Sequence, residues 1–166
     1  MRFKSVSHQK GIGLIEVLIS VFILASGLLG LAALQTQSLR FSHESYMRTL
    51  ASILASDMAD RIRVNSTEAL DTDNYIHALG ANTSGTATAC EDNACSSSEL
   101  AAYDYKQWDD QLVALLPGGE GQISASNKNA AGWREYTIVI QFNSISTDKS
   151  ASSTPDTSSF TYRTRI

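Results

Sequence analysis

The fold is decided by residues 1–35, which read MRFKSVSHQKG and then IGLIEVLISVFILASGLLGLAALQ. The first part is a short basic leader that ends at Gly11. The second part is a long apolar run that carries one charge, Glu16, near its start. A carboxylate at the centre of a bilayer costs about 2.5–3.5 kcal/mol on insertion scales. We therefore expect Glu16 to have a function that outweighs this cost.

Residues 12–34 have the length and composition of a membrane span. At 1.5 Å per residue, a helix of this run reaches about 35 Å, enough to cross a bilayer with some tilt. A secretory signal peptide has a shorter apolar core, followed by a cleavage site of small residues. Here the run continues without a stop into a helical pattern, so we expect it to be retained. Arg2, Lys4 and Lys10 precede it, and this positive-inside signal places the leader in the cytoplasm and the bulk of the chain outside.

Residues 35–63 are predicted to continue the span as an amphipathic helix. They contain no Gly or Pro, and apolar residues recur at mostly helical spacing among charged ones. One helix from Ile12 to Arg63 would be about 78 Å long, and few globular domains need such a helix. We therefore expect its first half, where small residues let helices approach closely, to pack against other copies or partners. His43 falls on the apolar stripe and is predicted to be a partly buried structural histidine. The stripe comprises Leu39, Met47, Leu50, Leu54, Met58 and Ile62.

Residues 64–98 read as a long polar connection that holds both cysteines of the chain, Cys90 and Cys95. A compartment outside the cytoplasm is oxidising, so the sequence predicts a disulfide between them. In the chain-entropy description, closing so small a loop contributes about 2 kcal/mol to stability.

Neither a metal site nor a cofactor is expected. The stretch from Asp71 to Asn74 hints at a calcium loop, but Ile76 stands where that loop needs glycine and Asn82 where it needs glutamate. A zinc site would need two ligands besides the cysteines, and no His-Cys cluster supplies them. A membrane-anchored periplasmic enzyme is an alternative, but the chain has no G-x-S-x-G elbow and no metal-ligand cluster. We therefore expect no catalytic residues.

The remaining chain predicts one more helix and a small sheet, which makes the fold class α+β. Ser96 and Glu99 form a capping box that opens the helix, and the stretch from Pro117 to Gly119 ends it. Three alternating segments then predict an antiparallel sheet of about three strands, packed on the second half of the long helix. The predicted apolar face of the helix comprises Leu100, Tyr103, Trp108, Leu112, Leu115 and Leu116. The predicted strands are 121–126, 133–143 and 160–166, with a hairpin loop at 127–132 and a polar loop at 144–158. Their inward residues are Tyr136, Ile138, Ile140, Phe142, Phe160, Tyr162 and Ile166.

The N-terminal pattern resembles the type III signal of type IV prepilins. The resemblance rests on the leader that ends at Gly11, on the position of Glu16 and on the uninterrupted apolar run. It implies cleavage of the Gly11–Ile12 bond by a prepilin peptidase and N-methylation of Ile12. It also implies that Glu16 pairs with the terminal amine of an adjacent subunit and sets the axial register during assembly. Alternatively, Glu16 complements the helix N-terminus, but that gain of about 0.3–1 kcal/mol is smaller than the insertion cost.

Further segments are similar to the PilV family of type IV minor pilins, and the similarity spreads over most of the chain. These segments are 54–63, 100–108 and 115–119. The resemblance implies a pilin fold with a long N-terminal helix on a small antiparallel sheet. The implied parts are a leader peptide (1–11), a transmembrane half (12–34), an amphipathic half (35–63) and a periplasmic globular domain (64–166).

The sequence departs from the usual pilin pattern at three positions. Ile12 stands where phenylalanine is usual, and Gly13 where threonine is common. Ala33 stands where many major pilins carry proline. The last departure favours a minor subunit.

The resemblance implies a minor pilin that helps initiate pilus assembly and is incorporated at or near the pilus tip, in support of piliation and twitching motility. The implied partners are the prepilin peptidase, other minor pilins, the major pilin and the inner-membrane assembly platform. The chain would span the inner membrane once, with a periplasmic C-terminal domain, before it joins the fibre. An acidic chain of net charge −4 argues against nucleic-acid binding. The alternative function is an I-type minor pseudopilin of a type II secretion system.

Overall fold

The computed structural model describes residues 13–81, 89–144 and 156–166. The chain forms two compact units, Met1–Ser42 and His43–Ile166. The leader, the Gly11–Ile12 bond and most of the predicted polar loop at 144–158 lie outside the described residues. The predictions that concern them therefore stay predictions.

Helix α1 runs over Leu14–Val64, 51 residues, and confirms the single long helix expected from Ile12 to Arg63. It opens with Glu16 in its first turn and closes with Arg61 and Arg63 in its last turn, where their charges complement the helix dipole. By length and composition, α1 is the one helix among the described residues that could cross a membrane. No residue of its apolar window is buried within the chain.

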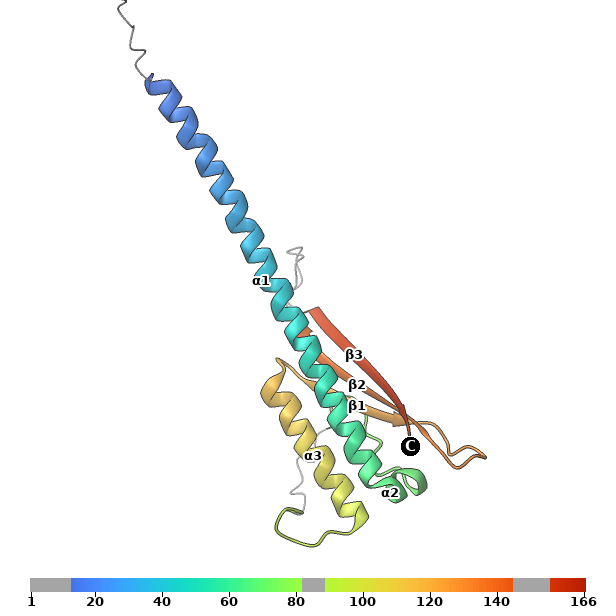
Figure 1. Cartoon of the computed structure of the whole chain (residues 1–166). Coiled ribbons are helices and arrows are strands. Elements are labelled where there is room, and N and C mark those ends of the chain that lie inside the picture. The colour runs from blue at the N-terminus through green and yellow to red at the C-terminus, as the bar shows by residue number, and fades with distance from the viewer. Residues whose placement is uncertain (1–12, 82–88, 145–155) are drawn as a thin grey trace, which may run out of the picture. The chain divides into compact units, whose positions relative to one another are not determined.

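The second unit contains a three-stranded antiparallel sheet in the order β1-β2-β3 (Figure 1). Its strands are β1 (Glu120–Ala125), β2 (Glu135–Ser144) and β3 (Asp156–Arg165). Helix α3 (Ser97–Leu115) lies beside the C-terminal part of α1, and both cover one side of the sheet (Figure 1). This arrangement confirms the predicted α+β architecture. The capping box is also present, because the Ser96 side chain accepts from the Glu99 amide and Glu99 accepts from the Ser96 amide.

The core lies between these two helices and the inner face of the sheet. Small residues of α1, Ala51, Ala55 and Ala59, are fully buried and let the neighbouring elements approach. Trp108 of α3 fills the centre, and its Nε1 donates a hydrogen bond of 2.9 Å to the Leu54 carbonyl. A side chain at Gly121 of β1 would collide with the Trp108 ring, which explains the glycine there. The predicted inward residues of β2 are buried: Tyr136, Ile138, Ile140 and Phe142. Those predicted for the last strand are half-buried: Phe160, Tyr162 and Ile166.

Several helical predictions are wrong. The connection at 64–98 contains a helix, α2 (Ser66–Asp71), which has no side-chain cap and is held by tertiary contacts. On α3, Tyr105 is buried where Tyr103 was expected, because the helix presents Ala101, Tyr105 and Trp108 to the core. Leu39 and His43 are exposed rather than on a buried stripe, since burial along α1 starts only near Met47.

Strand β3 starts at Asp156, four residues before the predicted Phe160. Its first residues are polar and show no apolar alternation, so side-chain pattern could not reveal them. Backbone pairing with β2 nevertheless continues to the Ser144–Asp156 pair. The early start follows from main-chain hydrogen bonding, which does not depend on the side chains.

Candidate assembly site

The first unit presents an apolar helical surface, called here the apolar stem and defined as residues 14–34. Its large side chains are strongly exposed; Leu14 is 80% exposed and Phe22 is 74% exposed. Contiguous apolar surface of this extent marks a membrane or protein contact. Gly27 and Gly30 leave open space at the helix surface, so a neighbouring helix could approach closely there.

Glu16 lies in the first turn of α1 and is exposed. Its amide donates to the Gly13 carbonyl at 3.0 Å, and its own carbonyl accepts from the Ser20 hydroxyl at 2.7 Å. Its carboxylate forms no ion pair with any residue that the structure describes. The carboxylate is therefore placed where it can accept either from the free amides of the first helical turn or from an external cation.

A buried polar network connects α1 to α3 in the second unit, and sequence reasoning missed it. Asp104 is 7% exposed, and its Oδ2 accepts from the Tyr75 hydroxyl at 2.8 Å. Arg61 lies 3.5 Å from the other Asp104 oxygen. Burial raises the pKa of Asp104, although Tyr75 and Arg61 act in the opposite direction. Asn65 completes the network with donor bonds to the Tyr75 hydroxyl and to the Ser97 carbonyl.

Arg134 joins the sheet to the end of α2. The residue is 6% exposed, and its guanidinium donates to the carbonyls of Ser126, Ala69 and Thr72 at 2.8, 3.2 and 2.6 Å. Its Nη2 pairs with Asp73 at 2.7 Å. The planar fork of five donors suits this set of converging oxygens. Arg134 thus donates to the Thr72 carbonyl at the end of α2 and shares the Ala69 carbonyl with the Tyr136 hydroxyl.

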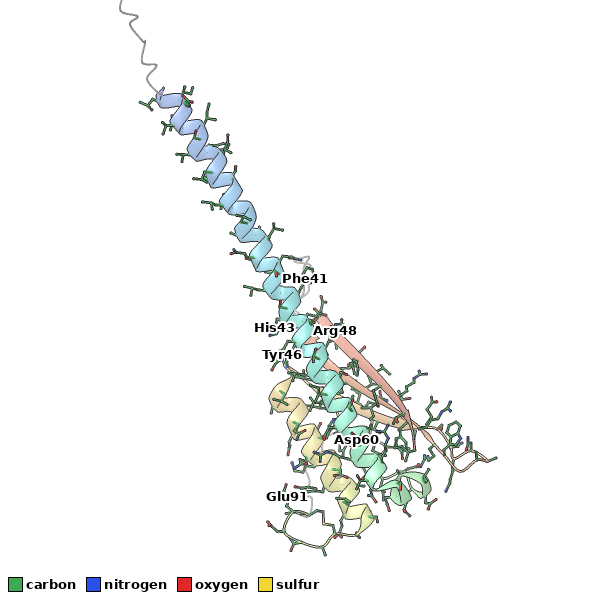
Figure 2. All side chains as sticks on the ribbon, in the orientation of Figure 1. Phe41, His43, Tyr46, Arg48, Asp60 and Glu91 are labelled. Carbon is green, nitrogen blue, oxygen red and sulfur yellow. A yellow bond between two sulfur atoms is a disulfide. The ribbon has the colours of Figure 1, made fainter. Side chains whose placement is uncertain are left out.

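A disulfide joins Cys90 and Cys95, as the sequence predicts. It closes the loop that holds Glu91 beside α3 (Figure 2). Glu91 accepts hydrogen bonds from the Tyr103 hydroxyl and, at 3.3 Å, from Gln107. The loop is therefore tied to α3 by polar contacts as well as by the covalent closure.

His77 stacks on Tyr105, with ring centroids 3.5 Å apart. His77 Nε2 and the Tyr105 hydroxyl are buried without a hydrogen-bond partner in the described part of the chain. Burial lowers the pKa of His77 and raises the pKa of Tyr105 to about 12. Both shifts keep the rings neutral, which suits a structural pair.

A groove of about 570 Å³ on the surface of the second unit includes His43. Met47 and the end of α3 supply its apolar walls. His43, Tyr46 and Arg48 project from α1 in this region (Figure 2). Across residues 13–81, 89–144 and 156–166, no group of three or more metal-ligating side chains is brought together.

Two protein families match the chain. The prokaryotic N-terminal methylation motif matches residues 6–32, which include Gly11, Ile12 and Glu16. The family described as type IV pilin Tt1218 (Tt1218-like) matches residues 33–106. These matches support a type IV pilin. No curated protein and no solved structure matches the chain at a significant level.

The fold agrees with this assignment, since a type IV pilin has a long N-terminal helix with an apolar stretch and a small antiparallel sheet. The matched residues cover α1, α2 and the first half of α3. The sheet lies beyond both matches, as do Arg134 and the C-terminal strand β3. The assembly signal and the helical core therefore carry the family likeness.

Proposed function

We propose that this type IV pilin is a minor pilin of the PilV type, which helps initiate pilus assembly and sits at or near the pilus tip. The observation that carries the proposal is the apolar stem, which has no buried residue and overlaps the methylation-motif match over residues 14–32. Such a stem needs lipid before assembly and other subunits afterwards. The minor role is supported by the PilV-like segments and by Ala33, which stands where many major pilins carry proline. A structural subunit of this kind supports piliation and twitching motility without catalysing a reaction.

The proposed N-terminal chemistry involves three residues. A prepilin peptidase cleaves the Gly11–Ile12 bond, and the amine released at Ile12 is methylated. The carboxylate of Glu16 pairs with the terminal amine of an adjacent subunit and so sets its axial register. The exposed position of Glu16 in the first turn of α1 supports this pairing, because no described side chain neutralises it.

The proposed location follows from the same features. Before assembly the chain spans the inner membrane once, with the leader in the cytoplasm and the second unit in the periplasm. The basic leader supports this orientation, and the Cys90–Cys95 disulfide suits an oxidising compartment. The proposed partners are the prepilin peptidase, the assembly platform, the major pilin and other minor pilins.

A minor pseudopilin of type II secretion is the second candidate. The methylation motif supports it as well, because pseudopilins carry the same signal. The two candidates differ in which process fails when the gene is lost. A secretion defect with normal pili would identify the pseudopilin.

The test is deletion of the gene in a piliated host, with a complemented strain as the control. We expect fewer surface pili, reduced twitching and major pilin that accumulates in the inner membrane. Immunogold labelling of an epitope-tagged copy should mark pilus ends rather than pilus shafts. A deletion strain with normal numbers of functional pili would contradict the priming role.

A further inference from the structure

The outer face of the sheet carries two arginines, Arg163 and Arg165, on strand β3. Both are exposed, and they lie two residues apart, so their side chains leave the strand on the same side about 7 Å apart. In the strand register, Arg163 lies opposite Thr137 and Arg165 lies opposite Glu135. The two helices α1 and α3 cover the other side of the sheet (Figure 1). The arginine pair therefore faces outward.

Trp133 extends this basic site. The Arg165 guanidinium lies 4.5 Å from the centroid of the Trp133 ring, a cation–π distance. A guanidinium stacked on its flat face still has its N–H groups free at its edge. The stacking restricts the Arg165 side chain and reduces the entropy that a partner would have to remove.

These two arginines differ from the other basic residues of the second unit. Each other described lysine or arginine there has a carboxylate within 4 Å. Those pairs are Arg48–Glu44, Arg61–Asp57, Arg63–Asp60, Lys106–Asp110, Lys128–Asp71 and Arg134–Asp73. Arg163 and Arg165 have no carboxylate partner within the described ranges, even though Glu135 lies across from Arg165. Among the described residues, the two adjacent guanidinium groups are therefore left available to an external anion.

We propose that Arg163, Arg165 and Trp133 form a contact surface for the carboxylates of a neighbouring pilin subunit. The proposal rests on the proposed function, because it requires assembly with other pilins. Charge complementarity supports it, since a second copy of this chain has a net charge of −4 and carries separate exposed carboxylates that could reach the arginines. Asp92 and Glu120 are exposed and form no ion pair with a described residue. A basic patch on one subunit and an acidic surface on the next suit the head-to-tail contacts of a helical fibre.

A simpler explanation is that the arginines only protect an edge strand from aggregation. Strand β3 is an edge of the sheet, and charges on edge strands discourage unwanted pairing. Protection requires charge but no particular neighbour, whereas the proposed contact requires a pilin at this face. Anionic lipid headgroups are a different occupant that the same guanidinium groups could bind.

The test is photo-crosslinking of the full chain in piliated cells, with the crosslinker at Thr161. Thr161 is exposed and lies on the same face as Arg163. Ala102, exposed on α3, is the control position. Mass spectrometry of the adduct at Thr161 should identify another pilin. In an R163Q/R165Q variant the adduct should fall about tenfold, equivalent to about 1.4 kcal/mol.

Two variants separate charge from other effects. K106Q/K128Q removes two positive charges, as R163Q/R165Q does, but it removes them from exposed ion pairs that contribute little to stability. It should leave the yield of the adduct unchanged. R163K/R165K keeps both charges and should retain more adduct than R163Q/R165Q. An adduct with phospholipid or a non-pilin protein would overturn the proposal, and so would an unchanged yield in R163Q/R165Q.

Failure of this inference can be told from failure of the proposed function. If the parent chain enters pili and R163Q/R165Q enters them equally well, only the contact surface is wrong. If the parent chain is absent from pili and deletion of its gene leaves piliation normal, the proposed function is wrong. The proposed contact surface is then wrong as well.

Discussion

Glu16 is the residue on which assembly is expected to depend, because a carboxylate in an apolar helix needs a compensating partner. We predict that Glu16→Ala is processed normally, since the Gly11–Ile12 bond is unchanged, but assembles poorly. The measurement is the amount of processed chain in sheared pili relative to the membrane. Ser20→Ala, one turn away on the same helix, is the control and should assemble normally. Normal incorporation of Glu16→Ala would contradict the amine–carboxylate mechanism.

His77 should make stability depend on pH. Burial lowers its pKa in the folded chain, so the unfolded chain binds more protons below pH 6.5, its ordinary value. Stability is therefore greatest above pH 6.5 and falls as the pH drops towards the folded pKa. Within that window the free energy of unfolding should change by about 1.4 kcal/mol per pH unit for this proton.

The measurement is urea unfolding of the detergent-solubilised full chain between about pH 5 and about pH 8. These limits lie on either side of the ordinary histidine pKa of about 6.5. His77→Phe keeps a ring to stack on Tyr105 but cannot bind a proton, so it should lose this slope. His43→Asn is the control, because His43 is exposed. An equal slope in His77→Phe and the parent chain would show that other groups cause the pH dependence.

Arg134 should contribute much more to stability than an exposed lysine does. Arg134→Met removes the guanidinium donor of the Ser126 and Thr72 carbonyls, whereas the Ala69 carbonyl keeps the Tyr136 hydroxyl, and the cost should be about 2–4 kcal/mol. The control is Lys128→Met, which removes an exposed pair with Asp71 worth at most about 1 kcal/mol. Denaturant unfolding of the full chain in detergent measures both. Equal effects would mean that the Arg134 contacts contribute no more than a surface pair.

At the scale of elements, α3 is organised by features that adjoin it in the chain. The capping box starts it, and the disulfide loop packs against its side through Glu91. Tertiary contacts hold its inner side, where Trp108 bonds to the α1 backbone and Asp104 pairs with Arg61. Local and long-range contacts therefore stabilise adjacent sides of one helix, and Gln107 bonds both Glu91 and Arg61.

Removal of the disulfide tests the local part. We predict that Cys90→Ser with Cys95→Ser lowers the free energy of unfolding by about 2 kcal/mol, because the closed loop is short. The Glu91 contacts should also loosen, which hydrogen exchange of residues 89–96 would show. Non-reducing peptide mapping of the native chain is the companion measurement. Free thiols at both positions in the periplasmic protein would contradict the predicted pairing.

At the scale of the whole molecule, we expect the N-terminal signal to determine processing and location. We predict a mature N-terminus at Ile12 that carries an N-methyl group. Mass spectrometry of pilus-associated protein measures it. Gly11→Val should leave the precursor in the membrane, because a bulky residue replaces the small one at the cleavage site. An intact leader, or a cut beyond residue 34, would contradict the prediction.

Local patterns allowed much of this fold to be predicted from the sequence. The span, the long helix, the capping box of α3 and the alternation of β2 each depend on neighbouring residues, so periodicity shows them. The Cys90–Cys95 pair was also predictable, because the loop is short and the export signal predicts an oxidising compartment.

Tertiary structure alone decided the features that join distant residues. Arg134 contacts α2 more than sixty residues away, and α2 is held by such contacts rather than by a cap. Arg61 meets Asp104 only because α1 and α3 pack together. That Arg163 and Arg165 have no carboxylate partner among the described residues likewise depends on where those carboxylates lie in the fold. Hydrophobic periodicity in the sequence shows whether a segment is a helix or a strand. These contacts depend instead on how the helices and strands pack together, which periodicity within one element does not determine.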